Sequence, residues 1–81
     1  MFFVYILQSE SSGRYYIGST KDTAQRLTQH NAGMMKSTRS FRPWRLVYTE
    51  TYETLPQARN REAQIKSWKN RSYMETVLGL K

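Results

Sequence analysis

The chain has 81 residues, enough for one small domain, so we expect a single domain over residues 1–81. It has no cysteine, which excludes disulfide bonds and thiolate metal sites. The formal net charge is +7, with 13 Lys and Arg against 6 Asp and Glu, so the expected partner is anionic, either nucleic acid or an acidic membrane surface.

The predicted strand at residues 2–8 has apolar side chains on both of its faces, which is typical of a strand buried on both sides. The apolar start lacks a basic leader and a small-residue cleavage site, and it is far shorter than the roughly 20 residues that span a bilayer. We therefore interpret it as a central strand and expect a cytoplasmic protein. A polar turn at 8–13 leads to an aromatic-rich strand at 14–20, which predicts an antiparallel hairpin.

The next segment has the signals of a helix followed by a loop. Asp22 with Gln25 three residues later has the pattern of a capping box, and Gly33 is a suitable helix stop. These residues predict a helix at about 23–32. The polar residues at 33–44 predict a long loop.

A strand pattern returns at 45–52, where apolar and polar side chains alternate. Thr54 with Gln57 forms a second capping-box pattern, which predicts a helix that runs to about Trp68.

A last short helix is expected to open at Ser72, with Glu75 three residues on, and to bury Met74, Val77 and Leu78. The element order is then β-β-α-β-α-α. This order predicts a small α/β (α+β) domain in which helices flank an antiparallel three-stranded sheet.

Two tyrosine tripeptides, Phe3-Val4-Tyr5 and Tyr16-Ile17-Gly18, are followed in the chain by Arg26, His30 and Glu62. This ordered set resembles the signature of the GIY-YIG nuclease superfamily, with the first tripeptide degenerate and the second complete. The resemblance covers nearly the whole chain. It is strongest to the small stand-alone branch of predicted endonucleases, which is similar to an excinuclease amino-terminal domain, and it implies the same three-stranded fold.

Glu62 is a carboxylate on the packing face of the predicted second helix, between Ala58 and Ile65. A carboxylate there is costly unless it is paired, protonated or bound to a cation. It can form a salt bridge with an arginine, lie at the exposed edge of the apolar stripe, or bind a hard metal ion such as magnesium. The family resemblance implies the last role, with Glu62 holding one divalent cation, Mg²⁺ or Mn²⁺.

Arg26 and His30 are four residues apart on the predicted first helix, so they share one face. A guanidinium can bind phosphate oxygens in pairs and stabilise charge during phosphoryl transfer. The imidazole can exchange a proton or contact the phosphate. Taken alone, the two residues are better explained by a solvated arginine and a histidine at a helix end. The family resemblance favours catalytic roles for both.

Tyr5 and Tyr16 lie on adjacent predicted strands, so their hydroxyls can come together if they share a face. A tyrosine with its usual pKa of about 10 is a poor base unless a cation or an arginine lowers the pKa. The resemblance implies that one tyrosine acts as the base, and we assign Tyr5 to this role and Tyr16 to positioning the substrate. Plain aromatic packing is the alternative, and we assign it to Tyr15. Gly18 either permits a close approach beside the site or marks a strand bulge.

Basic side chains are expected to bind the nucleic-acid backbone. These residues are Lys21, Lys36, Arg39, Arg42, Lys66 and Lys69. Phe41 and Trp44 lie among them and could stack on unpaired bases, but we expect both to fold inward. Asn70 matches an asparagine of the family only at a short spacing from Glu62, so no role is transferred to it.

The sequence therefore predicts a metal-dependent endonuclease that hydrolyses phosphodiester bonds in DNA, with RNA not excluded. Structured or damaged DNA, in repair or recombination, follows from the family resemblance alone. The alternative is a nucleic-acid-binding module with the nuclease fold that cleaves little without a protein partner or a homodimer. A role at anionic membranes is disfavoured, because no predicted helix combines a broad apolar face with a basic one.

Overall fold

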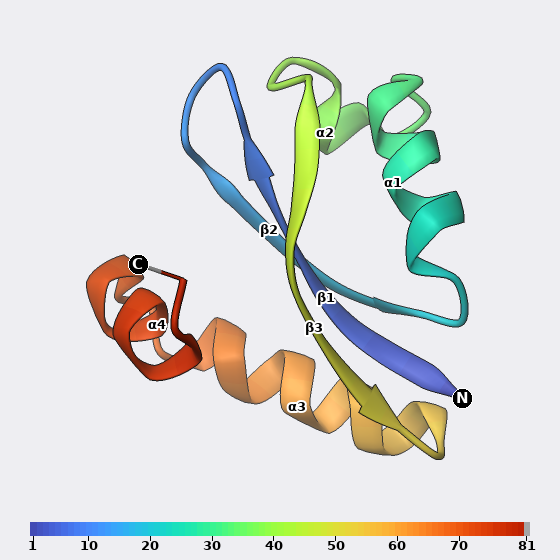
Figure 1. Cartoon of the computed structure of the whole chain (residues 1–81), viewed down its shortest axis with the longest axis vertical. Helices are drawn as coiled ribbons and strands as arrows, with labels where there is room; N and C mark the ends of the chain where they lie inside the picture. The colour runs from blue at the N-terminus through green and yellow to red at the C-terminus, as the bar shows by residue number, and fades with distance from the viewer. Residues whose placement is uncertain (81) are drawn as a thin grey trace.

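The computed structural model describes residues 1–80 and has strands and helices in the expected order (Figure 1). The elements are β1 (Phe2–Ser9), β2 (Tyr15–Thr20), α1 (Thr23–Asn31), α2 (Lys36–Arg39), β3 (Trp44–Tyr52), α3 (Leu55–Ser67) and α4 (Arg71–Leu78). The predicted three-stranded α/β fold is confirmed. Within residues 1–80, no helix is long and apolar enough to cross a membrane.

The strands pair antiparallel in the order β2–β1–β3, so the strand that comes first in the chain is the middle one. Tyr5 lies opposite Gly18 on one side and opposite Thr49 on the other. The register with β3 shifts between Ile6 and Leu7. The predicted central position of the apolar first strand is thus confirmed.

Helices cover both faces of the sheet, α1 and α2 on one face and α3 and α4 on the other (Figure 1). The core under α3 and α4 consists of Val4, Ile6, Ala58, Ile65 and Met74. The core on the α1 face consists of Tyr5, Leu7 and Trp44, with Tyr16, Leu27 and Phe41 packed against them. Successive side chains of β1 therefore enter opposite cores, as the pleat of a strand requires.

The segment predicted as a long loop at 33–44 contains the one-turn helix α2. Four residues are too few to show a helical period, and no side chain caps the start of this helix at Met35. The inward positions expected for the two aromatic residues nearby are confirmed. Trp44 is buried and its Nε1 donates to the carbonyl of Thr38 at 2.9 Å, while Phe41 is half-buried beside it.

The last helix differs from its prediction in two respects. Its N-cap is Asn70, whose side chain accepts the N–H of Tyr73 at 3.0 Å, and not Ser72. Val77, expected in the core, is 48% exposed.

Glu75, expected to help cap the last helix, is instead a buried link between α4 and β2. It accepts a hydrogen bond from the Tyr15 hydroxyl at 2.6 Å, and Arg71 lies 3.4 Å from it. The hydroxyl of Tyr15 thus has a polar partner, and its ring packs in the α3–α4 core as expected. A buried carboxylate of this kind needs such partners, because desolvation without them is costly.

Candidate active site

A groove of about 380 Å³ opens beside the end of β2, where α1 begins and the first half of α3 passes. We call it the β2–α1 groove. Its polar lining includes Ser19, Lys21, Gln25, Arg26, Gln29 and Arg59. Three of these side chains are cationic, and no carboxylate lines the groove, so it is suited to an anion such as a phosphate.

Helix α1 places Arg26 in this groove and His30 one turn further on, in the core. The helix begins where the Asp22 side chain accepts the N–H of Gln25 at 2.9 Å, and Gly33 follows its end with a φ of +79°. Arg26 is half-buried, whereas His30 has no exposed surface. The expected contact of His30 with a phosphate is therefore wrong, because its ring is covered.

His30 is held between two hydroxyl groups. Its Nδ1 lies 2.9 Å from Oγ1 of Thr38, and its Nε2 lies 3.3 Å from the hydroxyl oxygen of Tyr5. Thr38 Oγ1 has its own acceptor in the carbonyl of Met35 at 3.4 Å, so Nδ1 is the nitrogen that donates to Oγ1. Nε2 is then unprotonated and accepts from Tyr5. Burial, and after it the charge of Arg26, lowers the pKa of His30, so the ring is neutral at pH 7.

The two tyrosines share the α1 face of the sheet, which meets the condition that the sequence left open. The ring centroids of Tyr5 and Tyr16 are 6.2 Å apart, and the Tyr16 ring lies 4.6 Å from that of His30. Burial, followed by the proximity of Tyr16, raises the pKa of Tyr5, and the opposing charge of Arg26 does not overcome this. The charge of Arg26 lowers the pKa of Tyr5, as considered from the sequence, but desolvation outweighs it and the pKa is raised overall. Tyr5 is a neutral phenol in the folded protein.

Gly18 makes room for the Tyr5 side chain. A Cβ added at Gly18 would lie 2.7 Å from the Tyr5 hydroxyl oxygen and 2.8 Å from its Cζ. The ring of Tyr5 therefore lies over the backbone of β2, the edge strand next to it. The close approach expected at Gly18 is therefore made by the phenol ring of Tyr5.

Glu62 lies on α3, facing the same strand edge, with its side chain 20% exposed. Its Oε1 accepts from the Ser19 hydroxyl at 2.5 Å, and its Oε2 is 2.6 Å from the ammonium group of Lys66. Since Ser19 also lines the β2–α1 groove, the carboxylate adjoins that groove. Two of the three alternatives for Glu62 therefore do not hold. Its ion-pair partner is a lysine and not an arginine, and its side chain is largely buried and not exposed at the edge of the helix.

The donor set around Glu62 fits a magnesium-like ion that keeps most of its water. No three His, Asp or Glu side chains gather at one point within residues 1–80. Glu62 would therefore be the one carboxylate ligand, and water and phosphate oxygens would complete the coordination, as is common for Mg²⁺.

Glu50, the half-buried carboxylate of β3, is not available to bind a metal ion. It accepts from Arg61 at 2.9 Å and from the hydroxyls of Tyr48 and Tyr52. Burial pushes the pKa of Glu50 up, but these hydrogen bonds outweigh it and hold the pKa below its usual value. Glu50 ties α3 to β3 and has no oxygen free for a ligand, whereas the partners of Glu62 are a serine and a half-exposed lysine.

The six basic residues expected to bind nucleic acid lie at three different places in the structure. Lys21 lines the β2–α1 groove, and Lys66 and Lys69 line a second groove on the α3–α4 side. The other three are exposed at α2 and line neither groove: Lys36, Arg39 and Arg42.

Sequence reasoning missed two residues of the site, Arg59 and Ser19. Arg59 is three residues before Glu62 on α3, a spacing that already places the two on one side of a helix. Ser19 directly follows the second tripeptide, but nothing in the sequence indicates that its hydroxyl meets Glu62, because strand and helix are far apart in the chain.

Three comparisons show which known proteins this chain is similar to. A family model described as the GIY-YIG catalytic domain matches residues 1–75. UPF0213 proteins from Staphylococcus aureus strains Mu3 and Mu50 are each 40% identical over 76 residues, which cover 93% of this chain and 92% of theirs. The solution NMR structure of a UPF0213 protein from Bacillus halodurans is similar, with 34% identity and a TM-score of 0.61 over 100% of this chain and 86% of that chain.

Proposed function

This chain belongs to the GIY-YIG family, and we propose that it is an endonuclease that hydrolyses phosphodiester bonds in DNA with one divalent cation, Mg²⁺ or Mn²⁺. The observation that carries the proposal is the convergence of Tyr5, Arg26 and Glu62. Arg26 lines the β2–α1 groove, Glu62 adjoins it through Ser19, and the charges of both act on Tyr5. We assign the activity to structured or damaged DNA in repair or recombination.

The phosphate is held by the cations of the groove. Arg26 and Arg59 reach it from α1 and α3, and Lys21 from the turn between β2 and α1. Arg26 donates paired hydrogen bonds that strengthen as negative charge grows on the phosphate oxygens. The hydroxyl of Tyr16 orients the phosphate from the neighbouring strand.

The Tyr5–His30 pair accepts the proton of the attacking water. Tyr5 takes this proton on its oxygen while its own proton passes to Nε2 of His30, along the 3.3 Å contact between them. A phenol with a raised pKa can serve in this way. It gains one proton from the water as it gives another to His30, so it never becomes a free phenolate. His30 acts through Tyr5 and does not touch the substrate. Both side chains are buried, His30 with 0% and Tyr5 with 1% of its surface exposed, so the proposed mechanism requires substrate binding to open a path for water to the Tyr5 hydroxyl.

Glu62 would hold the cation, which when bound would supply neutralisation of the charge on the phosphate and on the leaving oxygen. Ser19 fixes one carboxylate oxygen by its 2.5 Å hydrogen bond. Lys66, whose side chain is 54% exposed, can release the other oxygen at little cost, because exposed ion pairs contribute about 0–1 kcal/mol.

A nicking assay tests the proposal on supercoiled plasmid and on a branched duplex, each with Mg²⁺, with Mn²⁺ and with EDTA. We expect metal-dependent cleavage by the wild type and a loss of at least about 100-fold in Glu62→Ala and Arg26→Ala, the scale of one lost electrostatic group. Glu10→Ala, an exposed glutamate outside the groove, is the matched control and should cleave normally. Equal cleavage by all four proteins would refute the proposal.

One observation favours a second function, that of a nucleic-acid-binding module that needs a protein partner or a second copy to cleave. Both oxygens of Glu62 are already engaged, by Ser19 and Lys66. Salt-sensitive DNA binding without nicking on either substrate would favour this alternative.

A further inference from the structure

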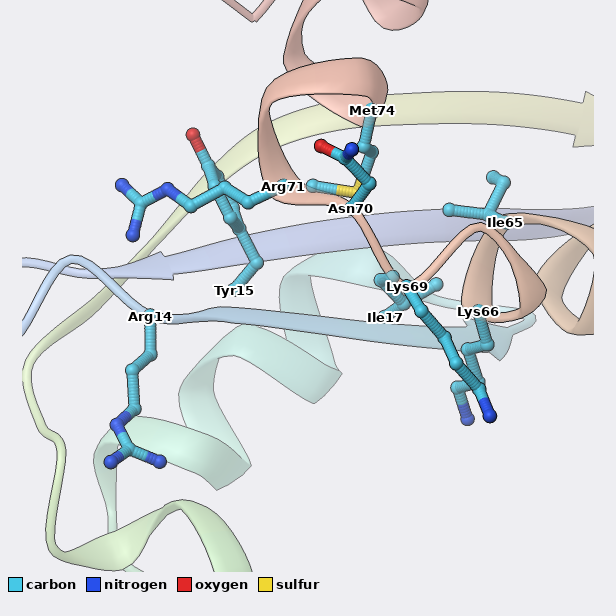
Figure 2. A pocket seen from close by; sticks show the side chains of 9 residues that line it. All are labelled: Arg14, Tyr15, Ile17, Ile65, Lys66, Lys69, Asn70, Arg71 and Met74. Carbon is cyan, nitrogen blue, oxygen red and sulfur yellow. The ribbon is translucent and has the colours of Figure 1, made fainter.

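A second groove, of about 430 Å³, lies between β2, the end of α3 and the start of α4 (Figure 2). We call it the α4 groove. Its floor is apolar and includes Ile17, Ile65 and Met74. Its rim is cationic: Arg14, Lys66, Lys69 and Arg71. Figure 2 shows the ammonium groups of Lys66 and Lys69 extending in the same direction at one end, with Arg14 and Arg71 toward the other end.

The ligand that suits this groove has an apolar, flat part and a negative charge. A lone phosphate would leave the apolar floor unused, and a closed duplex presents phosphates but keeps its bases stacked inside. An unpaired nucleotide has both parts, since its base and sugar can cover the floor while its phosphate meets the rim. No carboxylate is among the lining residues, although two of the rim cations have carboxylate partners beside the groove, Lys66 in Glu62 and Arg71 in Glu75.

The α4 groove is linked to the candidate active site by side-chain contacts. Lys66 lines the α4 groove and is 2.6 Å from Glu62, which accepts from Ser19 at 2.5 Å, and Ser19 lines the β2–α1 groove. The two grooves share no lining residue, and Glu62 connects a residue of one with a residue of the other. A single strand lying along the edge of β2 would pass both grooves.

The backbone at Lys69 has a conformation that lysine seldom adopts. Lys69 has a φ of +50° and is the one non-glycine residue with positive φ in the described part of the chain. Glycine is the usual residue in this conformation after a helix, because other side chains are strained there. Such strain is concentrated at ligand sites, where the side chain has a use.

Two neighbours of Lys69 are already positioned for a ligand. The guanidinium of Arg71 lies 4.9 Å from the centre of the Tyr15 ring and 3.4 Å from Glu75, which limits its movement. The Oδ1 of Asn70 caps α4, so its amide N–H groups are the part that can donate to a ligand.

We propose that the α4 groove binds an unpaired nucleotide of a DNA strand whose scissile phosphate lies in the β2–α1 groove. The proposal rests on the nuclease function above and deepens it, because it makes a duplex with a single-stranded flank the substrate class. A blunt duplex would leave the α4 groove empty.

The test is DNA binding measured by fluorescence anisotropy in EDTA, which keeps it independent of cleavage. The probes are a labelled single-stranded oligonucleotide and a blunt duplex of the same sequence. Lys69→Gly removes the ammonium group and relieves the backbone, and Asn70→Asp keeps the helix cap but adds a negative charge. The matched controls are Arg45→Gln and Asn60→Asp, at exposed positions that line neither groove.

We expect each groove variant to bind the single strand at least about fivefold more weakly, with both controls and all duplex affinities within about twofold of wild type. Single-strand affinities equal to those of the controls would overturn the proposal, as would equal losses on both probes. A loss of binding to phosphatidylserine vesicles with oligonucleotide binding unchanged would assign the groove to a membrane and overturn it too. The nicking assay with Glu62→Ala remains a separate test of the catalytic site.

Discussion

At the scale of single residues, the buried pair formed by Tyr5 and His30 explains how two poor bases can act together. Neither residue is charged in the folded protein, because burial raises the pKa of the phenol and lowers that of the imidazole. In the proposed step, their 3.3 Å contact passes the proton to His30, which then carries a buried positive charge between the hydroxyl groups of Tyr5 and Thr38. Thr38 fixes the tautomer that makes this transfer possible.

The neutral state of His30 makes stability depend on pH. Its pKa is lowered in the folded protein, whereas in the unfolded chain it returns to about 6.5. The unfolded chain therefore binds the proton more readily, so the free energy of unfolding is at its full value above about pH 6.5 and declines as the pH falls below it.

Urea unfolding from about pH 7.5 to about pH 5.5 checks this prediction, because the carboxylates titrate at lower pH. The chain has one histidine, so His30→Gln should have a flat profile over the same range. Parallel profiles for the two proteins would contradict the prediction.

A second prediction concerns Gly18. Its φ is not positive, so alanine fits the backbone, but the added Cβ would overlap the Tyr5 ring. We expect Gly18→Ala to lower the free energy of unfolding by about 1–3 kcal/mol, which is typical of overpacking, and to reduce nicking by displacing the hydroxyl of Tyr5. In a Tyr5→Leu background the same substitution should cost much less stability. A double-mutant cycle with no coupling would show that the contact is not the cause.

At the scale of the elements, the start of α4 shows what a sequence pattern can mistake. Ser72 and Glu75 have the spacing of a capping box, but Asn70 supplies the cap. We expect Asn70→Ala to lower the free energy of unfolding by about 1 kcal/mol and Ser72→Ala to change it by less than about 0.5 kcal/mol. Urea unfolding of both variants measures the difference. The reverse order of the two effects would place the helix start at Ser72.

The strands and longer helices were predictable because their signals are local. The double-sided apolar pattern of β1, the alternation in β3 and the cap at Thr54 each lie within one short segment. The adjacency of the strands that carry Tyr5 and Tyr16 also followed from the predicted hairpin. The burial of His30 did not, because it depends on Thr38 from α2, a helix too short to leave a periodic pattern.

The contacts of the acidic residues lay beyond sequence reasoning for a related reason. Glu62 meets Ser19, and Glu75 meets Tyr15, across more than 40 residues of chain in each case. Spacing along one helix indicates which side a carboxylate faces, but not which hydroxyl lies there. The exposure of Val77 likewise depends on what the rest of the fold places beside α4.

At the scale of the whole molecule, the net charge of +7 predicts DNA binding that weakens steeply with salt. For a single strand, log K should fall by about 0.7 per neutralised phosphate for each unit of log salt concentration, so about six contacts would give a slope near −4. Two charge-matched variants separate the grooves from the overall charge. One replaces three groove cations by glutamine: Lys21, Arg59 and Lys69. The control replaces the three cations at α2: Lys36, Arg39 and Arg42.

Binding titrations over a range of salt concentrations should give a slope shallower by about 2 for the groove variant and an unchanged slope for the control. Equal slopes for the two variants would mean that DNA responds to the net charge of the molecule and not to the grooves.

The order of the strands also determines which parts of the sheet can form first while the chain is being synthesised. β1 is the middle strand of the sheet although it comes first in the sequence, so during synthesis it can pair with β2 at once but must wait for β3. Local pairings form early and distant ones late, because closing a long loop costs entropy. The two tyrosines can thus meet within the first hairpin, while the carboxylate arrives only with α3, after the sheet is complete. Under the proposed mechanism, a half-made chain would carry the proton acceptor without the metal ligand, which would delay any cleavage of nucleic acid until the chain has folded.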